Sequence, residues 1–320
     1  RRRHTRLVSD WSSDVCSSDL NKINLDGDFT VTVDAGSVAA AHLNTINAKT
    51  TGLVTATAAT TITGTAAAIN TLIGNEGNSG DKVNLDSDFL VTIAAGSVSA
   101  AHLNTINAAT TGLVTATAAT ALTGTAAQIN TLVGNEGDSG DKVNLDTDYT
   151  ATITDTDIAA SVLNTLNSNV PGLVTATSVT NITGTAAAIN TLMGNEGDSG
   201  NKINLDGDFT VTVDAGSVAA AHLNTINAKT TGLVTATAAT TITGTAAVIA
   251  TLIGNEGDSG DKVNLASNVA VTVDSGSVAA SDLNSINAGT TGLVTATAAT
   301  TITGTAAAIN TLIGNEGDSG

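Results

Sequence analysis

The chain has 320 residues and a formal net charge of −18, with three Phe, one Tyr, one Trp and one Pro. So few large side chains argue against a thick, enzyme-like core, and the acidic charge repels nucleic acid and anionic membrane surfaces. A single Cys excludes an intrachain disulfide and a cysteine-based metal cluster. No apolar run approaches the roughly 18 to 20 residues of a membrane-spanning helix. We therefore expect a soluble chain that neither binds nucleic acid nor inserts into a membrane.

Residues 1–20 differ in composition from the rest of the chain. They hold all four Arg, the only Trp and the only Cys, which is Cys16. Residues 7–20 contain three Asp and lack the apolar stretch that a signal peptide needs. The sequence DWSSDVCSSDL at 10–20 resembles a translated sequencing adapter. We interpret residues 1–20 as a non-native leader, with a disordered polar leader as the alternative.

From residue 21 onward the chain repeats with a period of 60 residues. The five copies are 21–80, 81–140, 141–200, 201–260 and 261–320. Copies one and four differ at only three positions, which indicates recent duplication and leaves the natural copy number open. Stacked repeats normally end in atypical capping segments, whereas the last copy keeps the repeat sequence. We expect one continuous solenoid that is a fragment of a longer protein.

Each copy divides into two halves with the pattern of a strand followed by a short helix. In the first half, residues 29–33 alternate with period two, and residues 37–46 have helical apolar spacing. In the second half, residues 53–57 are a β-branched run, and residues 63–72 repeat the helical spacing. Side-chain N-caps are expected at Ser37, Ser97, Asp157, Ser217, Ser277, Thr63, Thr123, Thr183, Thr243 and Thr303.

Glycines mark the ends of these elements. Gly74 and its equivalents are placed to stop the second helix. Residues 50–52 join the two halves, and the copy at 141–200 has Val170, Pro171 and Gly172 at these positions. The pair Pro171 and Gly172 is suited to the two central positions of a type II turn. The acidic, Gly-rich segment after Gly74 lacks periodicity, so we expect a surface loop.

This order of elements predicts a right-handed α/β solenoid, with a strand and a short helix per half-repeat and leucine-rich-repeat-like stacking. Helices of about ten residues are marginal alone in water, so stability must come from stacking between neighbours. An all-β solenoid is the alternative, because Thr and Val are abundant enough to form strand rungs. The Ala-rich segments behind expected caps favour the helix.

Three recurring positions are explained most simply without a ligand. His42, His102 and His222 share one helix position, but equivalent residues two coils apart lie roughly 10 Å apart, too far to share a zinc ion. The aromatic series is expected to pack under the adjacent helix: Phe29, Phe89, Tyr149, Phe209 and Val269. The Asn series is expected to have a local or solvent role rather than to form a buried ladder: Asn44, Asn104, Asn164, Asn224, Asn284, Asn70, Asn130, Asn190 and Asn310.

Pairs of Asp precede the first strand in four of the five copies. They are Asp26 and Asp28, Asp86 and Asp88, Asp146 and Asp148, and Asp206 and Asp208. Carboxylates in flexible loops suit Ca²⁺, and the pairs would bind it if they converged with Glu76 and Asp81 at a repeat junction. The spacing matches neither an EF-hand nor a nonapeptide calcium repeat. A calcium site and a solvating acidic edge therefore both stay open, and nothing in the repeats forms a catalytic constellation.

Residues 160–166 and 122–132 resemble phrases in the tandem arrays of giant secreted bacterial surface proteins, particularly those of marine cyanobacteria and calcium-associated adhesins. The resemblance covers residues 21–320. It implies a non-enzymatic region of a large extracellular or cell-surface protein, in which the main partners are neighbouring repeats. Two functions follow: a structural spacer for adhesion, surface coating or motility, or a repeated binding surface for Ca²⁺, surface polysaccharide or ice. The second would use outward ranks of Thr, beginning with Thr30, Thr32, Thr55 and Thr57.

Overall fold

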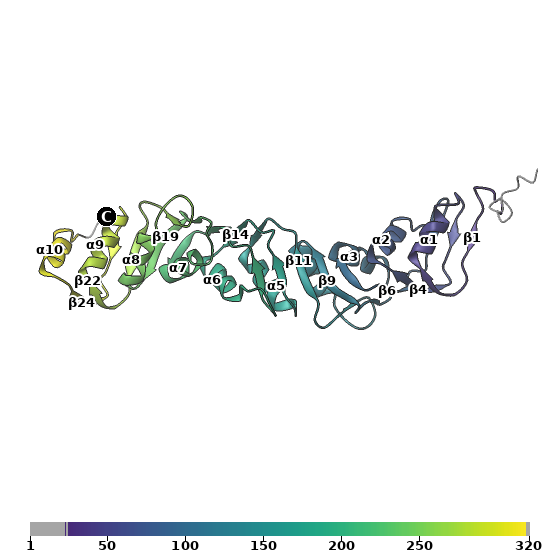
Figure 1. Ribbon diagram of the computed structural model, residues 1–320, viewed down its shortest axis with the longest axis horizontal. Coiled ribbons are helices and arrows are strands. Elements are labelled where there is room, and N and C mark those ends of the chain that lie inside the picture. Colours follow the sequence, from purple (N-terminus) through teal and green to yellow (C-terminus); the bar gives the residue numbers. More distant parts are fainter. Residues whose placement is uncertain (1–22, 24, 318–320) are drawn as a thin grey trace, which may run out of the picture.

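The computed structural model describes residue 23 and residues 25–317, so the expected leader at 1–20 lies outside the described residues. Within that range the chain forms ten helices and 24 strands. The molecule is elongated, and the elements follow one another along its length from β1 to α10 (Figure 1). Strands pair in parallel throughout the array. The α/β class is confirmed, and the helices rule out the all-β alternative.

Each repeat contributes two helices, as the sequence predicts. The helices are α1 (Ala40–Asn47), α2 (Ala66–Gly74), α3 (Ala100–Ala109), α4 (Ala126–Gly134), α5 (Ala160–Asn169), α6 (Ala186–Asn195), α7 (Ala220–Asn227), α8 (Ala246–Gly254), α9 (Ala280–Gly289) and α10 (Ala306–Gly314). Most second helices end at the expected glycine, and α6 runs one residue further. Each helix packs against the helix before it and the helix after it.

The strands form six parallel sheets, and three of these have five strands each in the described part of the chain. The first sheet contains β1 (Val31–Thr32), β3 (Val54–Thr55) and β5 (Val83–Asn84), and the last contains β22 (Gly276–Ala279) and β24 (Ala299–Thr303). The three five-stranded sheets are, first, β2 (Gly36–Ala39), β4 (Ala59–Gly64), β6 (Leu90–Ile93), β8 (Val114–Ala116) and β10 (Val143–Leu145); second, β7 (Gly96–Ser99), β9 (Ala119–Gly124), β11 (Thr150–Ile153), β13 (Val174–Ala176) and β15 (Ile203–Leu205); and third, β12 (Asp157–Ala159), β14 (Asn181–Gly184), β16 (Thr210–Val213), β18 (Val234–Ala236) and β20 (Val263–Leu265). The remaining sheet contains β17 (Gly216–Ala219), β19 (Ala239–Gly244), β21 (Ala270–Val273) and β23 (Val294–Thr295).

The number of strands per half differs from the sequence prediction of one. The repeat at 81–140 has β5, β6 and β7 before its first helix, and β8 and β9 before its second. A five-stranded sheet therefore takes its strands from three successive repeats, as β7, β9, β11, β13 and β15 do. The extra strands β7 and β9 are rich in Gly, Ser, Ala and Thr, so they lack a strong strand pattern. Pairing with neighbours, rather than intrinsic preference, makes them strands.

The expected N-caps are wrong at all ten positions, because those Ser, Thr and Asp residues lie in strands. Ser37 lies in β2 and pairs with Thr61 of the next half, and Thr63 lies in β4 and pairs with Thr92 of the next half. The second helices begin further along, where Thr65 accepts a hydrogen bond from the backbone N–H of Ala68 at 3.2 Å. Thr125, Thr185 and Thr305 cap their helices in the same way. Gly64, with φ of +144°, ends β4 directly before this cap.

Inward side chains of both halves form one continuous core along the array. The expected burial of the aromatic series is confirmed in four copies, since Phe89, Tyr149, Phe209 and Val269 are buried, and Phe29 is half-buried. These residues lie before a strand rather than in it. Most of the other core residues are Ala, Val, Ile and Leu. Because these side chains are small, helix and sheet have to approach closely along the whole length.

The link between halves is held by a close backbone contact rather than by a type II turn. A Cβ on Gly112 would lie 2.5 Å from the carbonyl oxygens of Asp88 and Phe89, so only glycine fits. The buried Thr110 hydroxyl donates to the Phe89 carbonyl at 2.6 Å and accepts from the Gly112 N–H at 3.0 Å. A type II turn would need a positive φ at Gly172, and Gly172 lies outside that region. The Pro-Gly prediction of turn type is therefore wrong.

In the copy at 141–200 the hydroxyl bridge is replaced by a direct bond. Val170 stands where the other copies have Thr, and it is buried. The Gly172 N–H donates directly to the Tyr149 carbonyl at 3.1 Å. The same backbone groups are thus satisfied with or without the hydroxyl.

The Asn residues of the first helix join consecutive helices, which corrects the expected local or solvent role. Asn104 Nδ2 donates to the carbonyl oxygen of Gln128 in the next helix at 2.9 Å. Asn44, Asn164, Asn224 and Asn284 make the same bond at 2.9 to 3.0 Å. The second-helix Asn differs, since no side-chain hydrogen bond of Asn130 is found in the described part of the chain, although Oδ1 is buried and unpaired in Asn104 and Asn130 alike. The two Asn series therefore have different roles.

We expect Asn104→Ala to lower the free energy of unfolding by about 1 kcal/mol, because it removes a partly buried hydrogen bond between helices. Asn130→Ala is the matched control and should cost less, since the Asn130 side chain makes no hydrogen bond in the described part of the chain and Ala250 occupies the same position naturally. Urea unfolding followed by circular dichroism measures both. Equal losses for the two variants would contradict the role given to Asn104.

Candidate functional site

The feature that recurs along the whole array is a row of Thr side chains on the outer face of the sheets. In one sheet Thr123, Thr152 and Thr175 lie directly opposite one another, and Asn204 follows. Their neighbours Leu122 and Val174 point into the core. Strand alternation therefore directs the Thr side chains outward, with about 4.8 Å between strands.

The same row recurs in the other sheets. We call these rows the threonine ranks: Thr32, Thr55 and Asn84; Thr63, Thr92, Thr115 and Asn144; Thr123, Thr152, Thr175 and Asn204; Thr183, Thr212, Thr235 and Asn264; and Thr243, Thr272 and Thr295. Thr32 and Thr55 were expected on this face, and the structure pairs them. Sequence reasoning missed Thr63, which it assigned to a helix cap.

A second row beside the ranks is irregular. It runs through Ser37, Thr61 and Leu90 in one sheet, and through Asp157, Asn181 and Thr210 in another. The threonine ranks are the more regular row, because Thr recurs in their central strands; the row continues to Ala or Ser on one side, as at Ser99 opposite Thr123, and to Asn on the other. Each Thr in them offers a hydroxyl and a methyl group at a fixed spacing, which suits a ligand with a repeating surface.

The hydroxyls of the ranks are only weakly engaged by the protein. Thr123 Oγ1 contacts the Val98 carbonyl oxygen at 3.5 Å, and Thr212 Oγ1 contacts Asn181 Oδ1 at 3.4 Å. A normal hydrogen bond from a hydroxyl to an oxygen has a distance of about 2.5 to 3.0 Å, so both of these contacts are long and weak. The hydroxyls therefore retain capacity for an external partner.

The acidic pairs hold turns in the backbone. Asp86 Oδ1 accepts from the Ser87 N–H at 2.7 Å, and Asp26, Asp146 and Asp206 make the same contact with the following residue. The expected convergence with Glu76 and Asp81 is not found: among residues 23 and 25–317, no three His, Cys, Asp or Glu side chains form a group that could hold a metal ion. A calcium site at the pairs, including Asp28, Asp88, Asp148 and Asp208, stays a prediction.

The His residues occupy a permissive position, as expected. His42 is exposed, and His102 and His222 are half-buried, each on the first helix of its repeat. The copies at 141–200 and 261–320 have Val162 and Asp282 there. A position that accepts His, Val and Asp does not depend on imidazole chemistry.

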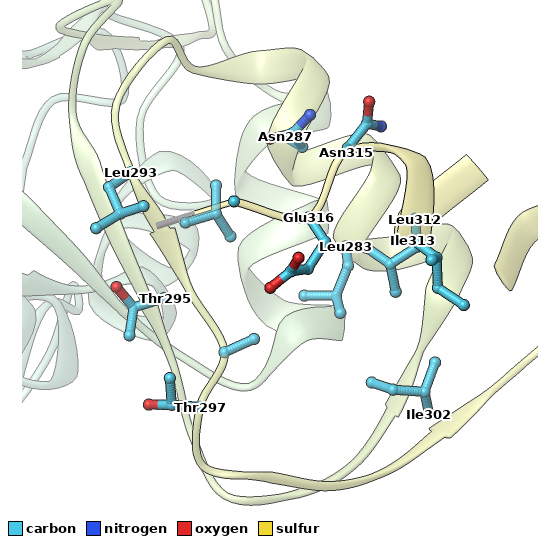
Figure 2. A pocket seen from close by; sticks show the side chains of 13 residues that line it. Leu283, Asn287, Leu293, Thr295, Thr297, Ile302, Leu312, Ile313, Asn315 and Glu316 are labelled. Atoms are coloured by element: carbon cyan, nitrogen blue, oxygen red, sulfur yellow. The ribbon is translucent and has the colours of Figure 1, made fainter. Parts of the chain in front are cut away.

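A cavity of about 540 Å³ lies at the C-terminal end of the array. Figure 2 shows Leu293, Ile302 and Leu312 around it, with Leu283 and the Glu316 carboxylate between them in this view. Part of the apolar lining, including Ile302 and Leu312, comes from positions that lie inside the core in earlier repeats, as Ile242 and Leu252 do. The cavity is therefore the open end of the stack rather than a shaped pocket for a small molecule.

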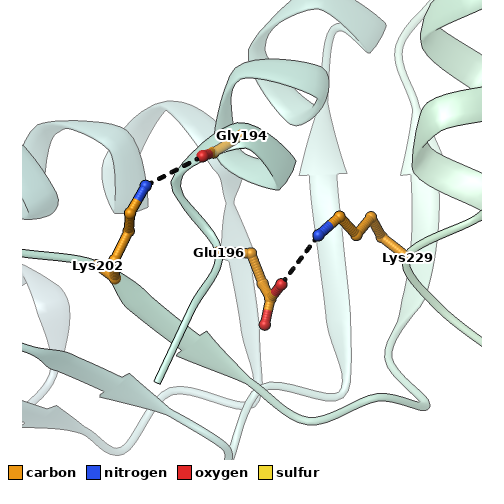
Figure 3. Close-up of polar contacts among 4 residues, drawn as sticks. All are labelled: Gly194, Glu196, Lys202 and Lys229. Carbon is orange, nitrogen blue, oxygen red and sulfur yellow. Dashed lines mark hydrogen bonds and ion pairs between the residues drawn. The ribbon is translucent and has the colours of Figure 1, made fainter. Parts of the chain in front are cut away.

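One ion pair crosses between repeats. Lys229 Nζ lies 3.2 Å from Glu196 Oε2, and Lys202 Nζ donates to the Gly194 carbonyl oxygen at 3.3 Å (Figure 3). Both partners of the ion pair are partly exposed, so it contributes about 0.2 to 1 kcal/mol at most. Copies two, three and five have no Lys at this position, so the pair is a local addition to the array.

Tyr149 has the one clearly shifted pKa in the described part of the chain. Burial raises the pKa of Tyr149 to about 12, and the negative charge of Glu136 adds to the shift. The phenol contacts the Asn169 carbonyl oxygen at 3.4 Å, which is too long for a strong hydrogen bond. Since Phe89 and Phe209 fill the same position, the hydroxyl is not a recurring functional group.

No protein-family model, curated protein or solved structure matches this chain. Within residues 23 and 25–317, the helices are all too short or too polar to cross a membrane.

We expect the stability of the protein to fall between pH 10 and about pH 12 in part because of Tyr149. The unfolded chain releases the phenolic proton near pH 10, whereas the folded chain holds it to about 12, so the unfolded state gains stability across that window. Tyr149→Phe should reduce this alkaline loss. Urea midpoints measured against pH for both proteins test it, and parallel pH curves would contradict it.

Proposed function

We propose that this chain is a structural spacer: an α/β solenoid that extends a larger extracellular or cell-surface protein. The observation that carries the proposal is the in-register pairing of each half with the next. Ile62 pairs with Val91, and the equivalent pairing recurs at the three following repeat junctions. Because each addition repeats the same contacts, length is set by copy number.

The core supports the same proposal. It is continuous along the array, and neighbouring helices pack only in chain order within the described range. Such a structure resists bending at any one junction because both a sheet and a helix layer cross it. Near-identical copies suit repeated extension better than a single catalytic centre, so we propose a non-enzymatic role.

The surface location rests on charge and on the resemblance of the repeats. A net charge of −18 keeps a long chain soluble and separates it from other acidic surfaces. The repeats need no disulfide for their core. Both features suit a region that holds other parts of a large surface protein apart.

A chain with one additional copy of residues 201–260 inserted after residue 260 tests the spacer. Its maximum dimension in small-angle X-ray scattering should increase by about 10 to 20 Å, between two strand spacings and two helix spacings. A flexible Gly/Ser insert of equal length is the control and should broaden the distribution of distances instead. An unchanged maximum dimension would contradict the spacer.

The threonine ranks favour a second function, and we propose that they bind a repeating surface such as a polysaccharide or ice. The ranks place hydroxyl and methyl groups about 4.8 Å apart across strands, in register over successive repeats. Their hydroxyls have only weak partners in the protein. A ligand with matching periodicity would satisfy several hydroxyls at once.

The triple variant Thr123→Val, Thr152→Val and Thr175→Val tests this surface, because Val keeps the β-branched shape and removes the hydroxyls. Binding on a glycan array, or thermal hysteresis, should fall roughly tenfold or more if each hydroxyl contributes about 0.5 to 1.5 kcal/mol. Thr131→Val is the control, since Thr131 is an exposed helix residue whose hydroxyl bonds its own helix. Negative results for the unmodified protein in both assays would end this proposal.

A further inference from the structure

We propose that the outer face of the sheets binds an uncharged polysaccharide, and that Asp157 and Asn181 divide this face into two binding segments. The outer face means the threonine ranks together with the second row beside them. This division rests on the binding function proposed for the threonine ranks, and it adds the chemical class of the ligand and the two residues that limit its binding.

The outer face carries almost no charge. Among the 24 strands that the structure describes, Asp157 in β12 is the one charged residue. Nearly all other acidic residues of the described range lie in the loops between helices and strands. In a chain with a net charge of −18, the outer face is therefore a neutral surface bordered by acidic loops.

A neutral face with acidic borders selects the charge of its ligand. An anionic polymer is repelled by the loops, whereas a cationic polymer is attracted to the loops rather than to the face. An uncharged polysaccharide avoids both effects, and its hydroxyls can pair with the weakly engaged Thr hydroxyls.

The division of the face among sheets favours a polymer over ice. The outer face is shared among six sheets in the described range. A flexible chain can follow it from one sheet to the next, whereas a rigid crystal surface needs all six sheets to lie in one plane. We therefore assign the face to a polysaccharide chain that lies along the array.

The single charge on the face stands in the copy at 141–200. Asp157 is exposed, and its Oδ2 accepts from the Thr156 hydroxyl at 3.3 Å. The other four copies have Ser at this position: Ser37, Ser97, Ser217 and Ser277. A neutral polymer lying across Asp157 would take its carboxylate out of water without supplying an opposite charge, which costs free energy. Asp157 therefore opposes binding at the middle of the array.

Asn181 pairs with Asp157 across the strands and changes the same region. Its Oδ1 accepts from Thr210 Oγ1 at 3.1 Å and lies 3.4 Å from Thr212 Oγ1. Thr210 Oγ1 also contacts the Thr180 carbonyl oxygen at 3.0 Å. The other copies have Thr or Ala at the position of Asn181: Thr61, Ala121, Thr241 and Thr301. Asn181 therefore engages hydroxyls that a ligand would otherwise meet.

A face interrupted in its middle binds a polymer as two segments. One segment precedes residue 141 and the other follows residue 200. A polymer that reaches both has to leave the face at the copy between them. Removing the interruption makes binding continuous along the array, and linked contacts of this kind raise affinity without a new type of contact.

The double variant Asp157→Ser and Asn181→Thr tests the interruption, because it introduces the residues that the copies at 21–80, 201–260 and 261–320 carry. Affinity electrophoresis of the full chain through gels that contain hydroxyethyl cellulose, dextran or laminarin measures the dissociation constants for three uncharged glucans. Mobility is expressed relative to gels without glucan. The double variant should bind the glucan that the unmodified chain binds about tenfold more tightly. A short oligosaccharide of that glucan should bind both proteins equally, because it spans one segment.

Two further variants serve as control and as reverse test. Asp141→Ser also removes one negative charge, but Asp141 is exposed in a loop outside the strands, so the affinity should not change. The pair Ser217→Asp and Thr241→Asn places a second interruption in the copy at 201–260 and should weaken polymer binding by a similar factor. Melting followed by circular dichroism checks folding, and the reverse pair keeps the test decisive if the Asp157 variant is destabilised.

Several outcomes overturn the proposal. Glucan binding by the unmodified chain with no gain in the double variant contradicts the two segments and leaves the binding function of the threonine ranks intact. An equal gain in Asp141→Ser would mean general charge repulsion. Equally tight binding of alginate, an anionic polysaccharide, contradicts a neutral ligand. Thermal hysteresis without glucan binding identifies ice instead. Neither activity in either protein overturns both the division and the function on which it rests.

Discussion

Parallel pairing between one half-repeat and the next is the interaction on which the rest of this structure depends. The helices have eight to ten residues, too few to be stable alone in water. They persist because the strands before them are fixed to neighbours on either side. The same pairing directs Ile62 and Val91 into the core and sends Thr63 and Thr92 outward. The register of strand pairing therefore determines both which residues form the core and which residues lie on the outer face.

The halves are related but not equivalent, and this asymmetry shapes the array. In the copies from residue 81 onward, the first half of a repeat brings three strands and the second brings two, and the three complete sheets in the described range each have five strands. A new sheet starts in every repeat. The threonine ranks are consequently short rows repeated along the molecule, which favours ligands whose own surface is periodic.

Polar contacts help to fix how neighbouring helices and half-repeats are positioned around a core made largely of Ala, Val, Ile and Leu. Asn104 joins two helices through a carbonyl oxygen, and Thr110 holds the link between halves. Gly112 lets that link approach to a distance that no side chain would permit. Each contact adds little free energy, yet it recurs in nearly every copy, so the total grows with length.

The sequence by itself determined the period of 60 residues, the division into halves, two helices per repeat and the burial of Phe89, Tyr149 and Phe209. These features depend on residue spacing along the chain, which is visible without a structure. Only the tertiary structure decided that Ser37 and Thr63 lie in strands, that Thr65 caps a helix and that Asn104 reaches the next helix. The physical reason is that the partners of Ser37, Thr63 and Asn104 lie about one half-repeat away in the chain, and their pairing moves the start of the second helix to Thr65. Local pattern indicates which residues prefer burial, whereas pairing between halves decides what each of them contacts.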